Sequence, residues 1–208
     1  MKKLISVLLL TLIPQSGFSY YTFQDTGDLL APGKYAPGAE LQFRTSNGSG
    51  NNIIGRWDGG WRDDLNWRGF VGLGKVDFQA GGLVKWVPIP DHDKQPAMGI
   101  SFGGMIATYS SDTEIAARFN PFLSKKFEIE FGELTPYTAV PIGFRTFDGD
   151  SNSTVQWVLG SRFIHPEMPG SHFFAEIGLD LDDAFTYMSV GASFPLNDDS
   201  RIDIWGDH

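Results

Sequence analysis

Four histidines and their neighbours are the groups in this sequence best suited to acid–base or nucleophilic chemistry: His92, His165, His172 and His208. A nucleophile needs a base within hydrogen-bonding reach, and a serine beside a histidine is the simplest candidate. Only Ser171 stands directly next to a histidine, His172. Adjacent side chains in a strand point to opposite faces, so these two would not pair. The sequence predicts no catalytic residue, and we do not expect an enzyme.

Several groups of acids have the composition of a metal site. Asp91-His92-Asp93 combines carboxylates with an imidazole, and the pairs Asp182-Asp183 and Asp198-Asp199 offer the oxygen ligands that calcium prefers. A twelve-residue calcium loop would also need its central glycine, and no such loop accompanies these acids. Aspartates are common in solvated turns. We therefore expect turn residues here, with no metal and no cofactor.

Many charged residues fall on one side of an alternating pattern, which we call the polar face. The opposite positions carry no charge. An acid–base pair among Glu114, Glu176 and Asp180 is one alternative, but the many cations on the same face favour salt bridges, because unpaired buried charge is costly. We predict that the polar face lines an interior and contains Glu40, Arg44, Arg56, Asp58, Arg68, Asp77, Lys85, Glu114, Arg118, Arg145, Arg162, Glu176 and Asp180.

The elements that position these charges are runs of period-two alternation. Between Phe173 and Leu181 every odd position is apolar, whereas the even positions include two carboxylates. After Asp182-Asp183 the alternation resumes and continues to Phe194, which predicts an antiparallel hairpin. Such runs have about the length, roughly 9–11 residues, with which a tilted strand crosses a bilayer.

The same alternation recurs along most of the chain. It predicts ten strands, near residues 39–45, 56–61, 65–73, 76–86, 98–107, 114–120, 139–145, 155–163, 173–181 and 187–194. We expect loops at 47–52, 88–96 and 148–153, whereas 125–131 either prolongs a strand or forms a structured turn. An even number of antiparallel strands lets a barrel close with both termini on one side. Eight strands remain an alternative.

Alternation alone does not say which face points inward, because a soluble antiparallel sheet also alternates. Complete exclusion of charge from one face favours a lipid-facing exterior, where an arginine costs about 2–4 kcal/mol at the bilayer midplane. Five tryptophans fall near predicted strand ends on the apolar face, as an aromatic girdle would place them: Trp57, Trp61, Trp67, Trp86 and Trp157. We therefore predict that the apolar face looks outward.

The first residues have the form of a secretory signal peptide. Lys2 and Lys3 precede the apolar run 4–13, and Gly17-Phe18-Ser19 supplies small residues before a cleavage site at Tyr20. We expect a signal peptide at 1–19, an N-terminal lead-in at 20–38, a barrel at 39–196 and a polar tail at 197–208. The mature chain then leaves the cytoplasm.

Composition agrees with an all-β protein outside the cytoplasm. The 208 residues include 25 glycines and no cysteine, so neither a disulfide nor a lipid-modified cysteine can form. The formal net charge of −9, without a basic stripe, argues against nucleic-acid binding.

Together these features resemble small, poorly characterised proteobacterial outer-membrane β-barrels. The similarity rests on the signal peptide, the alternating runs with short acidic or glycine turns, the closing hairpin 173–194, the segments 30–35 and 38–41, and Thr135-Pro136-Tyr137. It implies an outer-membrane location, with outer-membrane lipid and the barrel assembly machinery as partners. Such barrels commonly end on an aromatic residue, whereas here a polar tail follows Phe194.

We therefore expect an all-β, antiparallel up-and-down transmembrane β-barrel with a salt-bridged lumen. It would act as a structural membrane protein or as a narrow, weakly selective pore for small solutes or ions; the sequence leaves open whether the lumen is filled. Two alternatives are a periplasmic lipocalin-like barrel that holds a lipid inside, and a lipid-modifying membrane enzyme.

Overall fold

The protein is a closed antiparallel β-barrel. A computed structural model describes residues 22–45, 50–110, 112–197, 201–202 and 204, and the predicted signal peptide lies outside them. The strands are β1 (Tyr35–Arg44), β2 (Gly50–Arg62), β3 (Leu65–Gly74), β4 (Phe78–Ile89), β5 (Ala97–Tyr109), β6 (Asp112–Ser124), β7 (Phe127–Ile129), β8 (Gly132–Ala139), β9 (Ile142–Phe147), β10 (Asp150–Ile164), β11 (His172–Asp182) and β12 (Tyr187–Ser193).

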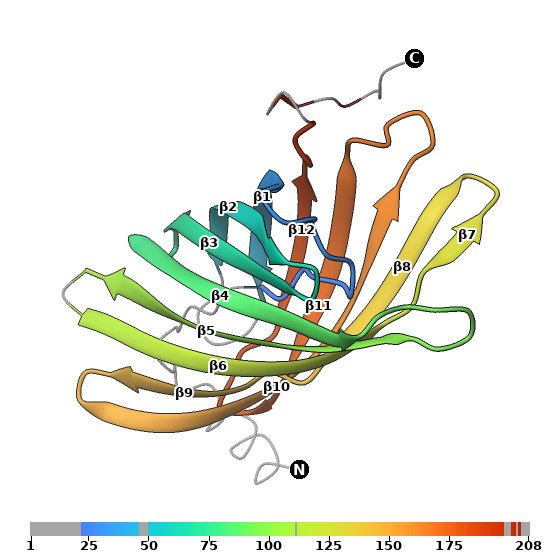
Figure 1. Cartoon of the computed structure of the whole chain (residues 1–208). Helices are drawn as coiled ribbons and strands as arrows, with labels where there is room; N and C mark the ends of the chain where they lie inside the picture. Colours follow the sequence, from blue (N-terminus) through green and yellow to red (C-terminus); the bar gives the residue numbers. More distant parts are fainter. Residues whose placement is uncertain (1–21, 46–49, 111, 198–200, 203, 205–208) are drawn as a thin grey trace, which may run out of the picture.

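Each strand pairs with its neighbours around the barrel, and β1 closes it against β12 from Gly38↔Ser193 to Arg44↔Tyr187 (Figure 1). β8 and β9 both lie between β6 and β10, so they act as one barrel strand. β7 pairs with β8. The described residues therefore build a ten-strand barrel, which confirms the predicted fold class.

Prolines explain why one barrel strand is divided in two. Pro141 lies between β8 and β9, and its missing N–H interrupts the ladder. Hydrogen bonds to both neighbouring strands nevertheless continue here. The Gln156 amide of β10 donates to the Pro141 carbonyl, and the Val140 amide donates to the Pro121 carbonyl of β6. Pro121 itself lies within β6, opposite Ile100.

Several predicted boundaries are wrong. β1 begins at Tyr35, so the end of the predicted lead-in belongs to the barrel. β2 begins at Gly50, which places Asn51 and Asn52 in a strand rather than in a loop, because they pair with Phe43 and Gln42. The predicted loop 148–153 is too long, because β10 begins at Asp150. The segment 125–131, for which two interpretations were open, contains β7, which forms a hairpin with β8. At the other end of the chain, Phe194 and Leu196 still donate to the carbonyls of Pro37 and Tyr35.

The two faces have the predicted orientation. Phe102, Ile177 and Val190 are 63%, 43% and 47% exposed on the outside, whereas Arg118 and Glu176 are each 3% exposed. A lipocalin-like barrel would need the opposite arrangement, with its apolar side chains inside.

Most of the tryptophans among the described residues lie at one end of the barrel. We call the end where β1 begins and β12 finishes the terminal end, and the opposite end the far end. Trp57, Trp61, Trp67 and Trp86 lie on β2, β3 and β4 near the terminal end, where Tyr35 contacts two of them. Trp157 lies in the middle of β10, so it does not belong to a girdle at a strand end.

Candidate functional site: a plugged lumen

The polar face points into the barrel along most of its length. Ten of its predicted residues are buried there: Glu40, Arg44, Arg56, Arg68, Lys85, Glu114, Arg118, Arg145, Arg162 and Glu176. Asp58 also lies inside, where its carboxylate contacts Arg68 at 2.5 Å and Arg56 at 3.4 Å.

The prediction is wrong for two acids near the far end. Asp77 lies in the β3–β4 connection, where it is exposed and accepts a hydrogen bond from the Ser110 amide. Asp180 is exposed near the end of β11 and accepts from the Ala184 amide at 2.9 Å. Both carboxylates therefore satisfy backbone amides at the far-end rim; Asp77 lies outside the strands, and Asp180 lies near the end of β11.

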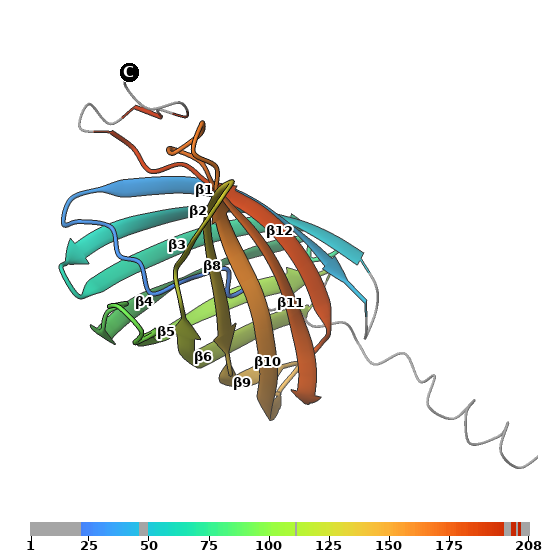
Figure 2. The same ribbon diagram turned by 90° about the vertical axis from the view of Figure 1, so that its right-hand side faces the viewer.

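The main feature that the alternation did not reveal is an internal segment. Residues 22–30, which we call the plug, run through the lumen before the chain turns back into β1, and Figure 2 shows this segment in blue inside the strands. The first five plug residues, 22–26, are all buried. The sequence indicated only a polar lead-in here, since a segment with no periodicity gives no sign of where it lies.

Glu176 holds the inner part of the plug. Its carboxylate accepts hydrogen bonds from the backbone amides of Phe23 and Gln24, at 2.8 and 2.5 Å. It also accepts from the hydroxyls of Tyr137, at 2.8 Å, and Tyr187. This buried carboxylate is thus satisfied by four donors, two of them from the plug.

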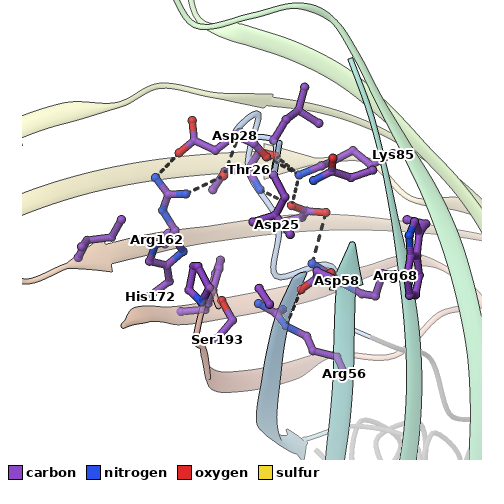
Figure 3. A pocket seen from close by; sticks show the side chains of 18 of the residues that line it. Asp25, Thr26, Asp28, Arg56, Asp58, Arg68, Lys85, Arg162, His172 and Ser193 are labelled. Atoms are coloured by element: carbon purple, nitrogen blue, oxygen red, sulfur yellow. Dashed lines mark hydrogen bonds and ion pairs between the residues drawn. The ribbon is translucent and has the colours of Figure 1, made fainter. Parts of the chain in front are cut away.

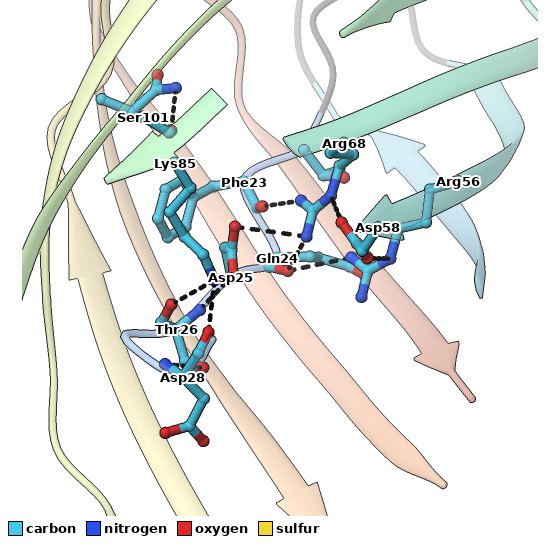
Figure 4. Close-up of polar contacts among 12 residues, drawn as sticks. Phe23, Gln24, Asp25, Thr26, Asp28, Arg56, Asp58, Arg68, Lys85 and Ser101 are labelled. Atoms are coloured by element: carbon cyan, nitrogen blue, oxygen red, sulfur yellow. Dashed lines mark hydrogen bonds and ion pairs between the residues drawn. The ribbon is translucent and has the colours of Figure 1, made fainter. Parts of the chain in front are cut away.

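Two arginines bind the carbonyls of the same plug residues. Arg68 donates to the Phe23 carbonyl at 2.9 Å, and Arg56 donates to the Gln24 carbonyl at 3.0 Å (Figure 4). Asp58 lies between the two guanidinium groups and pairs with both. The wall therefore contacts both the donors and the acceptors of the plug backbone.

Lys85 binds the next turn of the plug. Its Nζ lies 2.8 Å from the Asp25 carboxylate, 3.0 Å from the Thr26 carbonyl and 2.7 Å from the Asp28 carbonyl. Arg68 also pairs with Asp25, at 3.4 Å. Burial would raise the pKa of Asp25, but the nearby charges of Lys85 and Arg68 outweigh it, and the pKa lies below its ordinary value.

Asp28 ties the outer part of the plug to the terminal end. Arg162 pairs with both Asp28 and Glu133, and Lys126 lies 3.6 Å from Asp28 and 3.2 Å from Glu133. Burial again raises the pKa of Asp28, whereas Arg162 and Lys126 lower it by more, so the net shift is downward. This carboxylate is ionised at neutral pH.

Apolar side chains fill the rest of the interior in two clusters. The far-end cluster contains Ile54, Phe70, Val76, Leu83, Met105, Ala107, Ala116, Phe185 and Tyr187. Phe185 comes from the β11–β12 connection and packs against the Arg44 guanidinium, 5.0 Å from its ring centroid. Near the terminal end, Phe23 of the plug packs against Phe122 and Tyr137, with ring centroids 5.3 and 5.6 Å apart.

A cavity of about 380 Å³ lies beside the plug, close to the terminal end. Plug residues Asp25, Thr26 and Asp28 border it on one side, while Arg162 and His172 border it from the wall (Figure 3). Its surface combines ion pairs with apolar side chains, including Trp67, Leu83 and Phe174.

The acids considered as metal ligands in the sequence do not form a common site within the described residues. Asp91 does not face a cluster of metal ligands; it accepts from Lys125 Nζ at 2.5 Å and from the Lys126 amide at 2.7 Å. Asp183 pairs with Arg145 at 3.0 Å. No group of three or more metal-ligating side chains occurs within the described residues, which do not include Asp198 and Asp199.

Comparisons with known proteins identify the architecture. No family model matches the chain, and no curated protein matches its sequence. Among solved structures, the β domain of the Bordetella autotransporter BrkA is similar with a TM-score of 0.50 and 10% identity, covering 79% of this chain and 98% of that one.

Two further structures share the architecture at lower similarity. An outer membrane channel from Pseudomonas putida F1 has a TM-score of 0.46 and 9% identity, covering 85% of this chain and all of that one. A de novo designed transmembrane β-barrel has a TM-score of 0.41 and 12% identity, covering 81% of this chain and all of that one. These structural neighbours are membrane β-barrels, and at such low identity the likeness concerns the fold alone.

Proposed function

We propose that this chain is an outer-membrane β-barrel with a closed lumen, which acts as a structural membrane protein and not as an open pore. The single observation that carries the proposal is the plug, whose backbone and carboxylates are bound by the barrel wall. The uncharged exterior supports a lipid-facing surface, because buried or lipid-exposed unpaired charge is costly.

Closure by two parts supports the structural role. The plug occupies the terminal half of the lumen beside the cavity, and the far-end cluster, which includes Phe185 and Tyr187, occupies the other half. The two parts meet at Glu176, which accepts hydrogen bonds from both the plug and Tyr187. Outer-membrane lipid and the barrel assembly machinery are the partners that this role requires.

Conductance of the purified full-length protein in planar lipid bilayers tests the proposal. We expect insertion without stepwise current, after the folded barrel has been recognised in the outer-membrane fraction by a shift in gel mobility on boiling. Regular single-channel steps from such folded protein would instead support the narrow, weakly selective pore. Recovery of the mature protein as a detergent-free soluble species would contradict both roles.

The proposal also assigns no enzymatic activity. Ser171 is buried in the connection before β11, and His172 lines the cavity beside the plug. Hydrolysis of lipid by the detergent-solubilised protein, lost on His165→Ala or His172→Ala, would overturn this part of the proposal.

A further inference from the structure

The wall binds the plug in the way that a receptor binds an extended peptide. It donates to the carbonyls of Phe23 and Gln24, and it accepts from the amides of the same two residues. Farther along, the Ser124 hydroxyl accepts from the Gly27 amide at 2.8 Å. These hydrogen bonds involve only backbone atoms of the plug. Any extended chain that followed the same path could therefore form them.

The wall also selects for particular plug side chains. An aromatic ring at position 23 enters a pocket formed by Phe122 and Tyr137. Carboxylates at positions 25 and 28 reach two separate groups of cations, described above. The pattern is therefore an aromatic residue followed by acids two and five positions later.

The charge balance shows why the site prefers acids. The inward wall contains seven cations: Arg44, Arg56, Arg68, Lys85, Arg118, Arg145 and Arg162. With Asp77 and Asp180 exposed near the far-end rim, it has four of the six predicted acids, Glu40, Asp58, Glu114 and Glu176. Two further acids pair with these cations, Glu133 with Arg162 and Asp183 with Arg145. Together with Lys126, which pairs with Glu133, these described cations number eight against six acids, and the two plug carboxylates balance the excess of two. An uncompensated excess would attract another acidic chain.

The cavity beside the plug provides room for exchange. It borders Asp25, Thr26 and Asp28 directly, and it lies near the terminal end, next to the connections that precede β8 and β11. A second chain could therefore reach the same cations before the plug has left them. The far-end cluster does not have to move in this exchange, because it packs beyond the inner end of the plug.

From these contacts we propose that the terminal half of the lumen is a binding site for an acidic peptide segment of another protein, and that the plug is its internal competitor. The ligand is an extended chain with the spacing of Phe23, Asp25 and Asp28, and it enters from the terminal end. This inference goes beyond the proposed function, since a sealed barrel and a conducting one could both carry such a site.

Fluorescence anisotropy with the full-length protein in detergent tests the proposal. The probe is a labelled peptide with the sequence of residues 22–30, TFQDTGDLL, and the control probe is TFQNTGNLL. The variant D25N/D28N weakens the plug, so we expect it to bind the acidic peptide at least tenfold more tightly than the wild type does. Adding K85M should reduce that binding about tenfold, and so should replacing the acidic probe by the control probe.

The matched control is a disulfide that fixes the plug in its place. The chain has no native cysteine, so no other disulfide can form. A Cβ on Gly27 would lie 3.1 Å from Ser124 Oγ but would overlap the Ala97 side chain, so G27C/S124C is combined with A97G in the D25N/D28N background. We expect the oxidised form to bind no peptide and the reduced form to regain binding. A97G alone, and the gel-mobility shift of each variant, establish that the barrels are folded.

Three results would overturn the proposal. One is the absence of peptide binding by folded D25N/D28N protein. Another is equal binding of the two probes, which would remove the role of the carboxylates. The third is equal binding by the oxidised locked form, which would place the peptide elsewhere. None of these results depends on conductance, so they are separable from a failure of the proposed function.

Discussion

Asp25 is the plug residue whose charge is most fully compensated by the wall. Its side chain is only 10% exposed and lies within 3.4 Å of both Lys85 and Arg68. Removing one partner of a buried ion pair generally costs about 3–5 kcal/mol, because the other charge is left unpaired. The stability of the folded barrel should therefore depend on ionisation of this one carboxylate.

The sign of the pH dependence follows from the downward pKa shift of Asp25. A carboxyl group with a lowered pKa in the folded state contributes stability above its unfolded pKa, which is about 3.9, and loses that contribution as the pH falls through the folded value. We therefore expect the wild type to be more stable than D25N at pH 5–7, by roughly 3 kcal/mol, and the difference to shrink below about pH 4. Thermal unfolding in detergent, followed by near-UV circular dichroism across this range, measures it.

Asp28→Asn is the matched control for this prediction. Asp28 is also held by cations and its pKa is also lowered, but its side chain is 35% exposed. Solvent screening should make the loss smaller than that of D25N, with the same direction on acidification. A difference between D25N and wild type that stays constant from pH 3 to pH 7 would contradict the assignment.

Individual residues also mark the limit of the sequence-based prediction. Most members of the polar face could be recognised because the period of a strand fixes their direction. The prediction failed for Asp77 because this residue lies just outside β4, where it accepts a hydrogen bond from the Ser110 amide. The plug could not be found in this way, because its contacts depend on residues far away in sequence, such as Glu176.

At the scale of the elements, pairs of a glycine and an aromatic residue join neighbouring strands. In five cross-strand pairs, a Cβ added to the glycine would overlap the partner's ring: Gly59↔Trp67, Phe70↔Gly81, Gly99↔Phe122, Tyr137↔Gly160 and Gly178↔Tyr187. The ring thus covers the backbone of the facing glycine. This packing accounts for part of the high glycine content.

We predict that Gly178→Ala destabilises the barrel by about 1–3 kcal/mol, the usual cost of overpacking. The added methyl group would collide with the Tyr187 ring, whose hydroxyl also binds Glu176. The temperature at which the folded gel band disappears should therefore fall. Gly55→Ala in β2 is the control, since its Cβ would meet only one atom, at 4.0 Å. Equal effects of the two substitutions would show that ring packing is not the reason for glycine at position 178.

The strands and the order in which they pair were predictable, whereas their register was not. Alternation indicated all ten barrel strands, because each has one face in the interior and one outside. Which glycine meets which ring depends on register, and register is set by contacts across two strands. The prolines were likewise visible in the sequence, but only the structure shows that Pro121 is accommodated within β6 while Pro141 separates β8 from β9.

For the whole molecule, the lengths of the connections distinguish the two ends of the barrel. At the far end, the connections 75–77, 148–149 and 183–186 are short. At the terminal end, 63–64 is also short, but 90–96 and 165–171 are longer, and the β7–β8 hairpin extends beyond the barrel in Figure 1. Outer-membrane barrels more often have short turns on the periplasmic side and longer loops outside.

This distribution would by itself place the terminal end outside. We nevertheless expect the terminal end to face the periplasm, because the segments before β1 and after β12 both join the barrel at this end. A barrel that inserts from the periplasm then keeps these polar segments on the side from which the chain arrives. They do not have to cross the hydrocarbon core, where every polar group without a hydrogen-bond partner is costly.

Single cysteines in this cysteine-free chain test the orientation in intact cells. We expect Lys75→Cys, in the exposed β3–β4 connection, to react with a membrane-impermeant maleimide added outside. His92→Cys, in the terminal-end connection 90–96, should react only after the outer membrane has been permeabilised, because that end would face the periplasm. Labelling of both variants after permeabilisation shows that each thiol is accessible in the folded barrel. The reverse order, with His92→Cys labelled in intact cells, would mean that the terminal end faces outward and that acidic segments reach the lumen from outside the cell.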